Sequence, residues 1–578
     1  FAMSNADMEM TSHLYLAVLP ADEPSPMVAE SDEAVVTSDE DDEGDEGDEE
    51  ESEEGEEADE DIEVVIDFAN LAQRIVALPV ADASHRGLKA GEAGKVYYLK
   101  TEAGSNRYTS GQAAALCRFD LESREEETLS EGVSEFVVSA DGTKLLLHAG
   151  ESWRIVDAGE VEPGDGVLNT GAIQVRVDPR AEWEQIFNEA WRINRDYFYD
   201  PGMHGADWPA LREQYQQFLP DLACRDDLNR VMRWMCSELS VGHHYLGGGD
   251  FLDEPEDILG GLLGADFVIN DGRYRFERIY GGLNWNPDLR APLTEPGVDV
   301  NEGDFLLAVD GVDLLPSENL YRRFEQKADR IVELTVGPRV DYQGSRTVKV
   351  TPAASESSLR LRAWVEDNIR KVHEATDGRV AYVWLPNTST QGHTYFKRYF
   401  FPQADKEAII LDERFNRGGQ IADYYIDIMR RPHLCNWAFR YGQDLETPLS
   451  AIHGPKVMIT DETAGSGGDF LPWSFRQLGV GTIVGKRTWG GLVGILGFPP
   501  LMDGGYVSAP NLAIWTEDGF IVENVGVPPD IEVEQWPAEV IAGKDPQLER
   551  AIEEVLRQLA ENPPVERVRP EFPVRVRQ

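Results

Sequence analysis

Residues 456–470 constrain the fold of this chain more than any other stretch. They open with the β-branched run 456–460, which suits a buried strand, and pass through a polar, glycine-rich turn into a run that can be helical, 470–478. Ser466 therefore lies where a strand becomes a helix. A helix N-terminus presents unpaired amide N–H groups, so an oxyanion formed by attack of Ser466 would meet the N–H of Gly467. The stretch predicts a nucleophilic serine, and the alternative is a glycine-rich turn with a serine N-cap.

The size and composition of the chain indicate a multidomain globular protein. Its 578 residues are enough for roughly three to five domains, each with its own core. Hydrophobic residues make up 41%, yet no apolar run reaches the roughly 18 residues of a membrane span, so none is expected. The four cysteines lack C-x-x-C spacing. Neither a disulfide framework nor a metal or cofactor site is therefore expected, and a cytoplasmic location fits best.

About a third of the net charge of −53 lies in one tract. Residues 39–63 contain 19 acidic and no basic residues. Such a segment repels itself and cannot bury a core, so we expect a disordered acidic loop over residues 37–63. The remainder of the chain is also acidic, which argues against nucleic acid as a partner.

Before residue 176 the sequence predicts short strands separated by turns. We expect an N-terminal cloning scar and β segment over residues 1–36, and partial β-propeller blades over residues 64–175. A few blades do not close a propeller, so either this half has another all-β form or the chain lacks earlier blades. The expected strands cover residues 62–67, 74–79, 95–99, 115–120, 135–139 and 144–147.

Residues 176–253 have a helical period and should form a helical domain. Helices are expected from residue 181, over 209–218 and over 225–239. The last helix leads into Gly242-His243-His244. Adjacent histidines point in different directions, so a metal pair is a poor interpretation. Each histidine is either a hydrogen-bonded structural residue or a catalytic one.

Residues 254–355 are predicted to form a small β-rich module. The string at 300–311 resembles the core of PDZ domains, and the string at 260–267 resembles their carboxylate-binding loop. Such a loop holds a peptide terminus with backbone N–H groups while the peptide adds a strand to the sheet. The alternative is a PDZ-like fold that only supports its neighbours.

An α/β pattern fills residues 356–578. A connecting helix over 361–375 precedes strands at 380–385 and 407–412. The second strand leads to the paired glycines Gly418 and Gly419, where backbone amides can approach a ligand.

Taken together, these motifs resemble the catalytic domain of tricorn protease. The resemblance covers nearly the whole chain and implies the C-terminal half of such a protein. It implies a multidomain α+β fold: partial β-propeller blades, a helical bundle, a PDZ-like module and a crotonase-like α/β catalytic domain. The matching motifs are at residues 191–200, 412–419, 464–469, 485–491 and 522–530.

The resemblance also implies roles for individual residues. Ser466 falls on the nucleophile, His243 on the general base, and Glu523 on the acid that polarises the base. This is chemically sensible, because a serine hydroxyl needs a base and the base needs a third group to fix its tautomer. The remaining roles fall on backbone and neighbouring residues: the N–H groups of Gly467, Gly418 and Gly419 for the oxyanion hole, and Gly467 and Asp469 for substrate binding.

The chain departs from the family pattern at two positions. The family has a serine just before the catalytic histidine, relaying the glutamate, where this chain has Gly242. Glu523 would then act directly or through water. The family also has an aspartate just after the nucleophile, which favours basic side chains at the cleavage site. Gly467 stands there and gives no support to a trypsin-like preference.

Two alternatives to this triad remain open. One is the serine–lysine dyad of the related C-terminal processing peptidases, whose lysine would fall near Gly491, with Lys486 nearby. The other is an inactive peptide- or ligand-binding scaffold, as in the retinoid-binding relatives, which Gly242 supports. The favoured hypothesis is a cytoplasmic serine peptidase acting on oligopeptides. By resemblance it would be a hexamer, with closed propellers acting as size filters.

Overall fold

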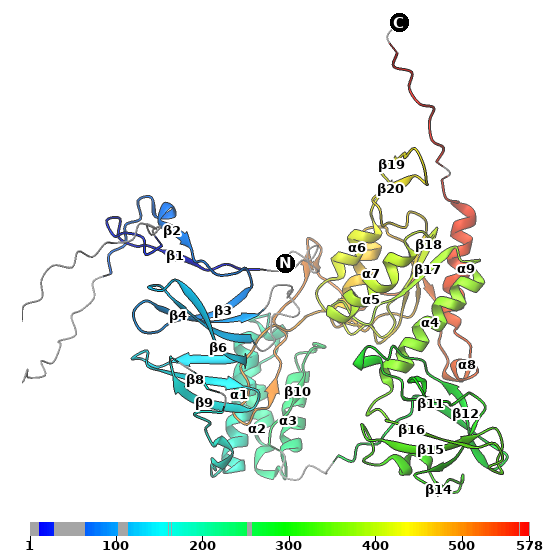
Figure 1. Cartoon of the computed structure of the whole chain (residues 1–578), viewed down its shortest axis with the longest axis horizontal. Coiled ribbons are helices and arrows are strands. Elements are labelled where there is room, and N and C mark those ends of the chain that lie inside the picture. The colour runs from blue at the N-terminus through cyan, green and yellow to red at the C-terminus, as the bar shows by residue number, and fades with distance from the viewer. Residues whose placement is uncertain are drawn as a thin grey trace, which may run out of the picture. The chain divides into compact units, whose positions relative to one another are not determined.

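A computed structural model describes residues 11–27, 64–101, 114–159, 161–162, 164–250, 257–565 and 567–576. The acidic loop expected over residues 37–63 lies outside the described residues. The chain divides into two compact units, Phe1–Arg176 and Val177–Gln578 (Figure 1). No helix within the described part of the chain is long and apolar enough to cross a membrane.

The first unit consists of antiparallel strands. One sheet has four strands in the order β3-β4-β5-β6, and a second has three in the order β7-β8-β9. Tyr97, Leu116 and Leu145 are among the buried side chains of their shared core. The strands are β1 Tyr15–Ala17, β2 Ile75–Ala77, β3 Ser84–Ala90, β4 Lys95–Thr101, β5 Ala114–Asp120, β6 Glu125–Val133, β7 Glu135–Val138, β8 Lys144–Ala149 and β9 Ser152–Asp157.

Some strand predictions in this unit were wrong. Residues 64–67 form no strand, whereas β3, β6 and β9 were not predicted. The strand β6 illustrates the reason, because only Leu129 and Val133 of its nine residues are buried. An antiparallel strand with one solvated face can carry many charges, which hides it from a hydrophobic pattern.

The second unit begins with the expected helices. They are α1 Pro179–Tyr197, α2 Trp208–Gln216 and α3 Arg225–Ser237. Their core also contains Leu501 and Val507 from far along the chain. A buried ion pair joins Arg225 Nε to Asp503 Oδ2 at 2.7 Å. The short strand β10 Leu246–Gly247 pairs with β23 Tyr506–Val507. The segment after α3 is therefore tied to the later part of the chain.

A separate sheet forms the PDZ-like module, with β11 at its edge in the order β11-β12-β13-β15-β16. The amides of the predicted carboxylate-binding loop have internal partners. Gly264 N donates to Glu356 Oε2 at 2.8 Å, and Leu262 N donates to the carbonyl of Ala353 at 2.8 Å. These internal contacts favour the alternative that the PDZ-like fold only supports its neighbours. The strands are β11 Ala265–Asn270, β12 Arg273–Ile279, β13 Phe305–Val309, β14 Val312–Asp313, β15 Val332–Gly337 and β16 Arg346–Val350.

The last part of the unit is built on a parallel sheet in the order β17-β18-β21-β22-β26. Helices α4 and α9 pack on one face (Figure 1), for example through Val372 and Val555. The side chains of the opposite face, such as Ile409 and Met458, are equally buried. Both faces are thus covered, which suits nearly continuous apolar strands.

The elements of this part follow the expected order. The strands are β17 Val380–Trp384, β18 Ala408–Asp412, β19 Cys435–Trp437, β20 Leu445–Thr447, β21 Lys456–Thr460, β22 Thr482–Gly485, β24 Trp515–Thr516, β25 Gly519–Phe520 and β26 Ile531–Glu532. The helices are α4 Ser357–Ala375, α5 Thr390–Phe400, α6 Ala422–Met429, α7 Gly467–Gln477, α8 Pro537–Ile541 and α9 Pro546–Glu561.

Candidate active site

Ser466 lies on a sharp turn between β21 and α7. Its backbone has φ 59° and ψ −117°, a conformation that a residue with a Cβ rarely adopts. Its amide donates to Asp469 Oδ2 at 2.9 Å and to the carbonyl of Gly491 at 3.0 Å. The helix begins at Gly467, earlier than the predicted residue 470. A strained turn held by surrounding contacts is typical of functional sites.

Asp469 is buried and does not face substrate. The residue is 0% exposed. Besides the amide of Ser466, its carboxylate accepts the amides of Gly490 at 2.8 Å and Gly491 at 3.1 Å, and the hydroxyl of Thr488. Burial raises its pKa, and these hydrogen bonds oppose that rise. The prediction that Asp469 binds substrate was wrong, since no part of it is accessible. It ties the nucleophile turn to residues 488–491.

Two of the three predicted oxyanion-hole amides are available. The amide of Gly418 donates to Asn416 Oδ1 at 2.9 Å, so this part of the prediction was wrong. The amides of Gly467 and Gly419 donate to no group in the described part of the chain. A Cβ placed on Gly467 would lie 2.7 Å from Gly419 N and 2.0 Å from Thr388 Oγ1. The two free amides are therefore close together, and residue 467 has room only for glycine.

His243 is a buried imidazole beside the nucleophile turn. The residue is 5% exposed, and its ring lies 5.2 Å from that of Trp489 and 5.8 Å from that of Tyr245. Among the described residues nothing hydrogen-bonds to Nδ1, and no hydrogen bond joins the ring to Ser466. Burial lowers the pKa of His243, and the charge of Glu523 partly opposes this. The imidazole is thus kept in the neutral form that a general base needs.

Glu523 contacts the backbone next to His243, and not the imidazole. Its Oε1 accepts the amide of Gly242 at 2.9 Å, while Oε2 accepts those of Leu492 at 2.6 Å and Val493 at 2.7 Å. The prediction that Glu523 polarises the base therefore finds no direct contact. The carboxylate accepts three backbone hydrogen bonds beside the residue predicted to be the base.

The loop that presents Glu523 is strained. Val522 has φ 70° and Asn524 has φ 61°. A positive φ at a β-branched residue is a genuine outlier. Asn524 compensates in part, because its amide donates to the carbonyl of Gly490 at 2.7 Å and its side chain donates to that of Ser240 at 2.8 Å.

The residues of a serine–lysine dyad are not assembled. Lys486 Nζ pairs with Glu532 Oε1 at 2.8 Å and with Glu534. These hydrogen bonds raise its pKa, which makes it a poor base. At Gly491 a Cβ would lie 2.3 Å from the Trp489 ring. The ring therefore fills the place from which the lysine of a dyad would start.

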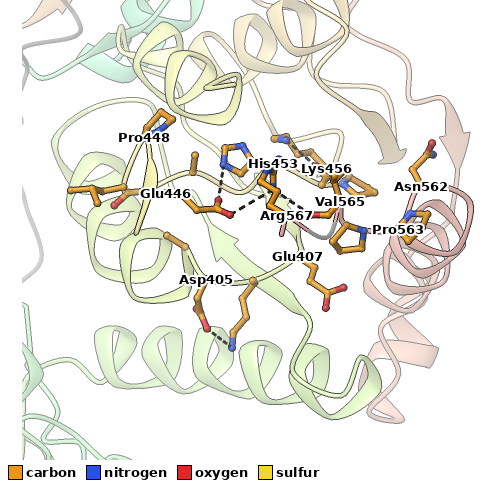
Figure 2. Close-up of a pocket in the computed structure, with 18 of the residues that line it drawn as sticks. Asp405, Glu407, Glu446, Pro448, His453, Lys456, Asn562, Pro563, Val565 and Arg567 are labelled. Carbon is orange, nitrogen blue, oxygen red and sulfur yellow. Dashed lines mark hydrogen bonds and ion pairs between the residues drawn. The ribbon is translucent and has the colours of Figure 1, made fainter. Parts of the chain in front are cut away.

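A cavity lies elsewhere, at the opposite edge of the sheet (Figure 2). Its volume is about 1000 Å³, and its lining includes Glu407, which precedes β18, and Lys456, which begins β21. Ser466 follows the carboxyl end of β21. Figure 2 also shows Glu446 between His453 and Arg567, with N–O distances of 3.4 Å and 3.6 Å. The cavity therefore does not belong to the predicted site.

Sequence reasoning missed one residue of this site, Trp489. Its only signal is its position between Thr488 and Gly490-Gly491 in a matched motif. Its contacts with His243 and with several glycines come from separate parts of the chain, and no local pattern reveals them.

Three family models match parts of the chain. They are the tricorn protease C1 domain at residues 179–237, the tricorn protease PDZ domain at 261–355, and peptidase family S41 at 379–533. The expected PDZ-like and peptidase domains are thereby confirmed.

Similar full-length proteins point to the same group. The chain is 34% identical to tricorn protease homolog 1 of Streptomyces coelicolor, over 86% of this chain and 48% of that protein. It is 32% identical to a putative tricorn-like protease C-terminal subunit of Sulfurisphaera tokodaii, over 86% and 58%. The crystal structure of the tricorn protease matches with a TM-score of 0.79 and 27% identity, over 85% and 48%. The chain thus spans about half the length of these relatives.

Proposed function

Because the chain carries the C1, PDZ and S41 peptidase domains of tricorn proteases, we propose that it is a serine peptidase hydrolysing oligopeptides. Ser466 is the nucleophile, His243 the general base and Glu523 the acid behind it. One observation carries this proposal: the strained turn of Ser466 at the start of α7, beside the free amides of Gly467 and Gly419. Such amides stabilise a developing oxyanion.

The reaction proceeds through an acyl-enzyme. Ser466 Oγ attacks the scissile carbonyl while the imidazole of His243 takes the hydroxyl proton. The carbonyl oxygen, now an anion, accepts hydrogen bonds from Gly467 N and Gly419 N. The C–N bond then breaks, and His243 returns its proton to the leaving amine. A water molecule, deprotonated by His243, hydrolyses the ester and releases Ser466.

Glu523 acts as a fixed anion. It stabilises the imidazolium of His243 by its charge, and it fixes the backbone of Gly242 immediately before the base. Any hydrogen bond from Nδ1 to the carboxylate passes through water, because Gly242 supplies no hydroxyl. A water-mediated contact of this kind is compatible with a peptidase that has Gly242 where the family has a serine.

The finer architecture belongs to the same proposal. The four-stranded antiparallel sheet β3–β6 has the form of a propeller blade, and the parallel sheet with helices on both faces suits a crotonase-like domain. We place the domain boundaries at residues 1–36, 37–63, 64–175, 176–253, 254–355 and 356–578.

The setting of the enzyme is also proposed. Assembly into a hexamer, with propellers restricting access to oligopeptides, is inferred from the tricorn resemblance. The four cysteines are free in the structure, and a cytoplasmic location would keep them so.

The test is the Ser466→Ala variant. Peptide hydrolysis and labelling by a fluorophosphonate probe should both be lost, while the thermal unfolding profile stays unchanged. Ser474→Ala, on the same helix, is the matched control and should retain both. Hydrolysis by the Ser466→Ala variant would overturn the assignment, and an unreactive Ser466 in the native protein would favour the inactive scaffold.

A further inference from the structure

Trp489 occupies a seat made by three glycines. A Cβ placed on Gly465 would lie 2.5 Å from its ring, one on Gly242 would lie 2.9 Å away, and one on Gly491 would lie 2.3 Å away. A Cβ essentially never comes closer than 3.0 Å to a heavy atom outside its own residue and that residue's two chain neighbours. The three glycines come from separate stretches, and each leaves out a side chain that the indole replaces. We call this arrangement the tryptophan seat.

The tryptophan seat joins the two halves of the site. Gly242 directly precedes His243, and Gly465 directly precedes Ser466. The backbone amide of Trp489 donates to the carbonyl of Ala464 at 2.9 Å, which fixes it to the nucleophile turn. Its ring also meets the His243 imidazole, with centroids 5.2 Å apart and planes inclined at 54°. One side chain therefore spans from the nucleophile turn to the base.

No polar group of the described residues holds the His243 ring. Nδ1 lacks a hydrogen-bond partner, and Glu523 uses its two oxygens on three backbone amides. The charge of Glu523 acts on His243, and the Tyr245 ring lies 5.8 Å away. The neighbouring His244 also interacts with His243 by charge, and Nε2 of His244 is hydrogen-bonded to Asn194 Oδ1 at 2.9 Å. The orientation of the imidazole thus depends on aromatic packing.

We propose that Trp489 is the positioning residue of His243, and this rests on the proposed peptidase function. The indole restricts the rotamers of the imidazole and keeps water from its face. An aromatic face within about 6 Å of a cation also attracts it. When His243 takes the proton of Ser466, the Trp489 ring stabilises the imidazolium. The indole thereby supplies part of what the missing direct carboxylate contact would provide.

The tryptophan seat also explains why residue 242 is a glycine. The space beside residue 242 that a serine side chain would enter is filled by the far edge of the indole ring. A serine hydroxyl at residue 242 and the Trp489 indole would therefore occupy the same volume, so only one of them can orient the base. In this chain the indole occupies it.

The test compares Trp489→Phe and Trp489→Ala with the control Trp515→Ala, whose residue is 69% exposed on β24. We expect kcat of Trp489→Ala to fall about 10- to 100-fold with KM nearly unchanged, because a base displaced by about 1 Å loses rate on this scale. Phenylalanine should restore kcat to within about fivefold, since it keeps an aromatic face. The Trp515→Ala control should match the native protein.

A second measurement does not depend on turnover. In protein carrying Ser466→Ala and ¹³C-labelled histidine, the His243 resonance is titrated with and without Trp489→Ala. Trp489→Ala admits water, which raises the His243 pKa, and removes the attraction of the indole for the imidazolium, which lowers it. Because burial is the largest cause of the shift of this pKa, we expect a net rise. An unchanged titration, or a KM increase at constant kcat, would overturn the positioning role. If native protein shows no hydrolysis, the proposed function fails, yet the titration still decides whether Trp489 controls His243.

Discussion

The strands of the parallel sheet end at a carboxyl edge, where their carboxyl ends meet, and at an amino edge, where their amino ends meet. These two edges differ in how their polar groups are used. At the carboxyl edge, the Asp469 carboxylate alone accepts three backbone amides and a hydroxyl with no exposed surface. At the amino edge, a cavity of about 1000 Å³ brings together charged side chains of both signs, such as Glu407 and Lys456. This cavity is therefore not where the chemistry is expected.

Strand β21 connects the two edges, because Lys456 is its first residue, at the amino edge, and Ser466 follows its carboxyl end. Lys456 Nζ donates to the carbonyl of Gly454 at 2.9 Å, and burial lowers the pKa of Lys456 to about 8. Carboxyl ends of parallel strands collect the loops that bind ligands in open α/β sheets. Hydrogen-bond saturation, more than volume, distinguishes the edge at which we propose that catalysis occurs.

Removing the anchor of the carboxyl edge should have the largest effect. Asp469→Ala leaves the buried amides of Gly490 and Gly491 and the Thr488 hydroxyl without their acceptor, while the amide of Ser466 keeps the carbonyl of Gly491. Each unsatisfied buried donor costs about 1–3 kcal/mol, so we expect the free energy of unfolding to fall by at least ~3 kcal/mol, with loss of hydrolysis. Denaturant unfolding measures this. Glu446→Ala at the cavity is the control and should change stability by no more than ~0.5 kcal/mol.

The second prediction concerns the charge behind the base. Glu523→Gln removes the anion and turns an acceptor oxygen into a donor that faces backbone amides. We expect kcat/KM to fall about 10²- to 10⁴-fold, the range for loss of the acid in a serine triad. Steady-state kinetics on a peptide substrate provides the measurement. A decrease smaller than about fivefold would contradict the role of Glu523.

The third prediction is the acidic limb of the pH profile. Burial lowers the His243 pKa below 6.5, so the limb of kcat/KM should lie below pH 6.5. Between the folded pKa and 6.5 the unfolded state binds more protons, so stability contributed by this group falls as pH decreases through that window. Since the Glu523 charge opposes the shift, Glu523→Gln should move the limb to still lower pH. A limb above pH 6.5 would refute this.

The smallest effect is expected at the amino edge. Lys456→Met should leave kcat/KM within about twofold of the native value. The folded pKa of Lys456, about 8, is below its ordinary 10.5, so burial of the charge opposes folding at pH 7 and this penalty fades as pH rises from 8 to 10.5. The variant should therefore be more stable at pH 7, by ~1 to 2 kcal/mol. A large loss of activity would mean that the two edges are coupled.

The sequence predicts this architecture well where a pattern is local. The turn at Ser466, the helices before His243 and the strands of the parallel sheet follow from periodicity and glycine placement. The burial of Asp469, the occupied amide of Gly418 and the tryptophan seat do not. Each of these features depends on which distant segment of the chain fills a space of a few ångströms. Packing between distant segments decides this, and a local sequence pattern does not reveal it.

The contact of Gly264 N with Glu356 Oε2 has a consequence for the PDZ-like module. The loop that would hold a peptide terminus already holds a carboxylate from the same chain. A tethered ligand has an effective concentration on the order of millimolar or higher. A free peptide can bind only during the fraction of time in which Glu356 is displaced, and its apparent affinity falls by that fraction. The PDZ-like module is therefore expected to bind poorly to peptide termini that have low affinity or low concentration.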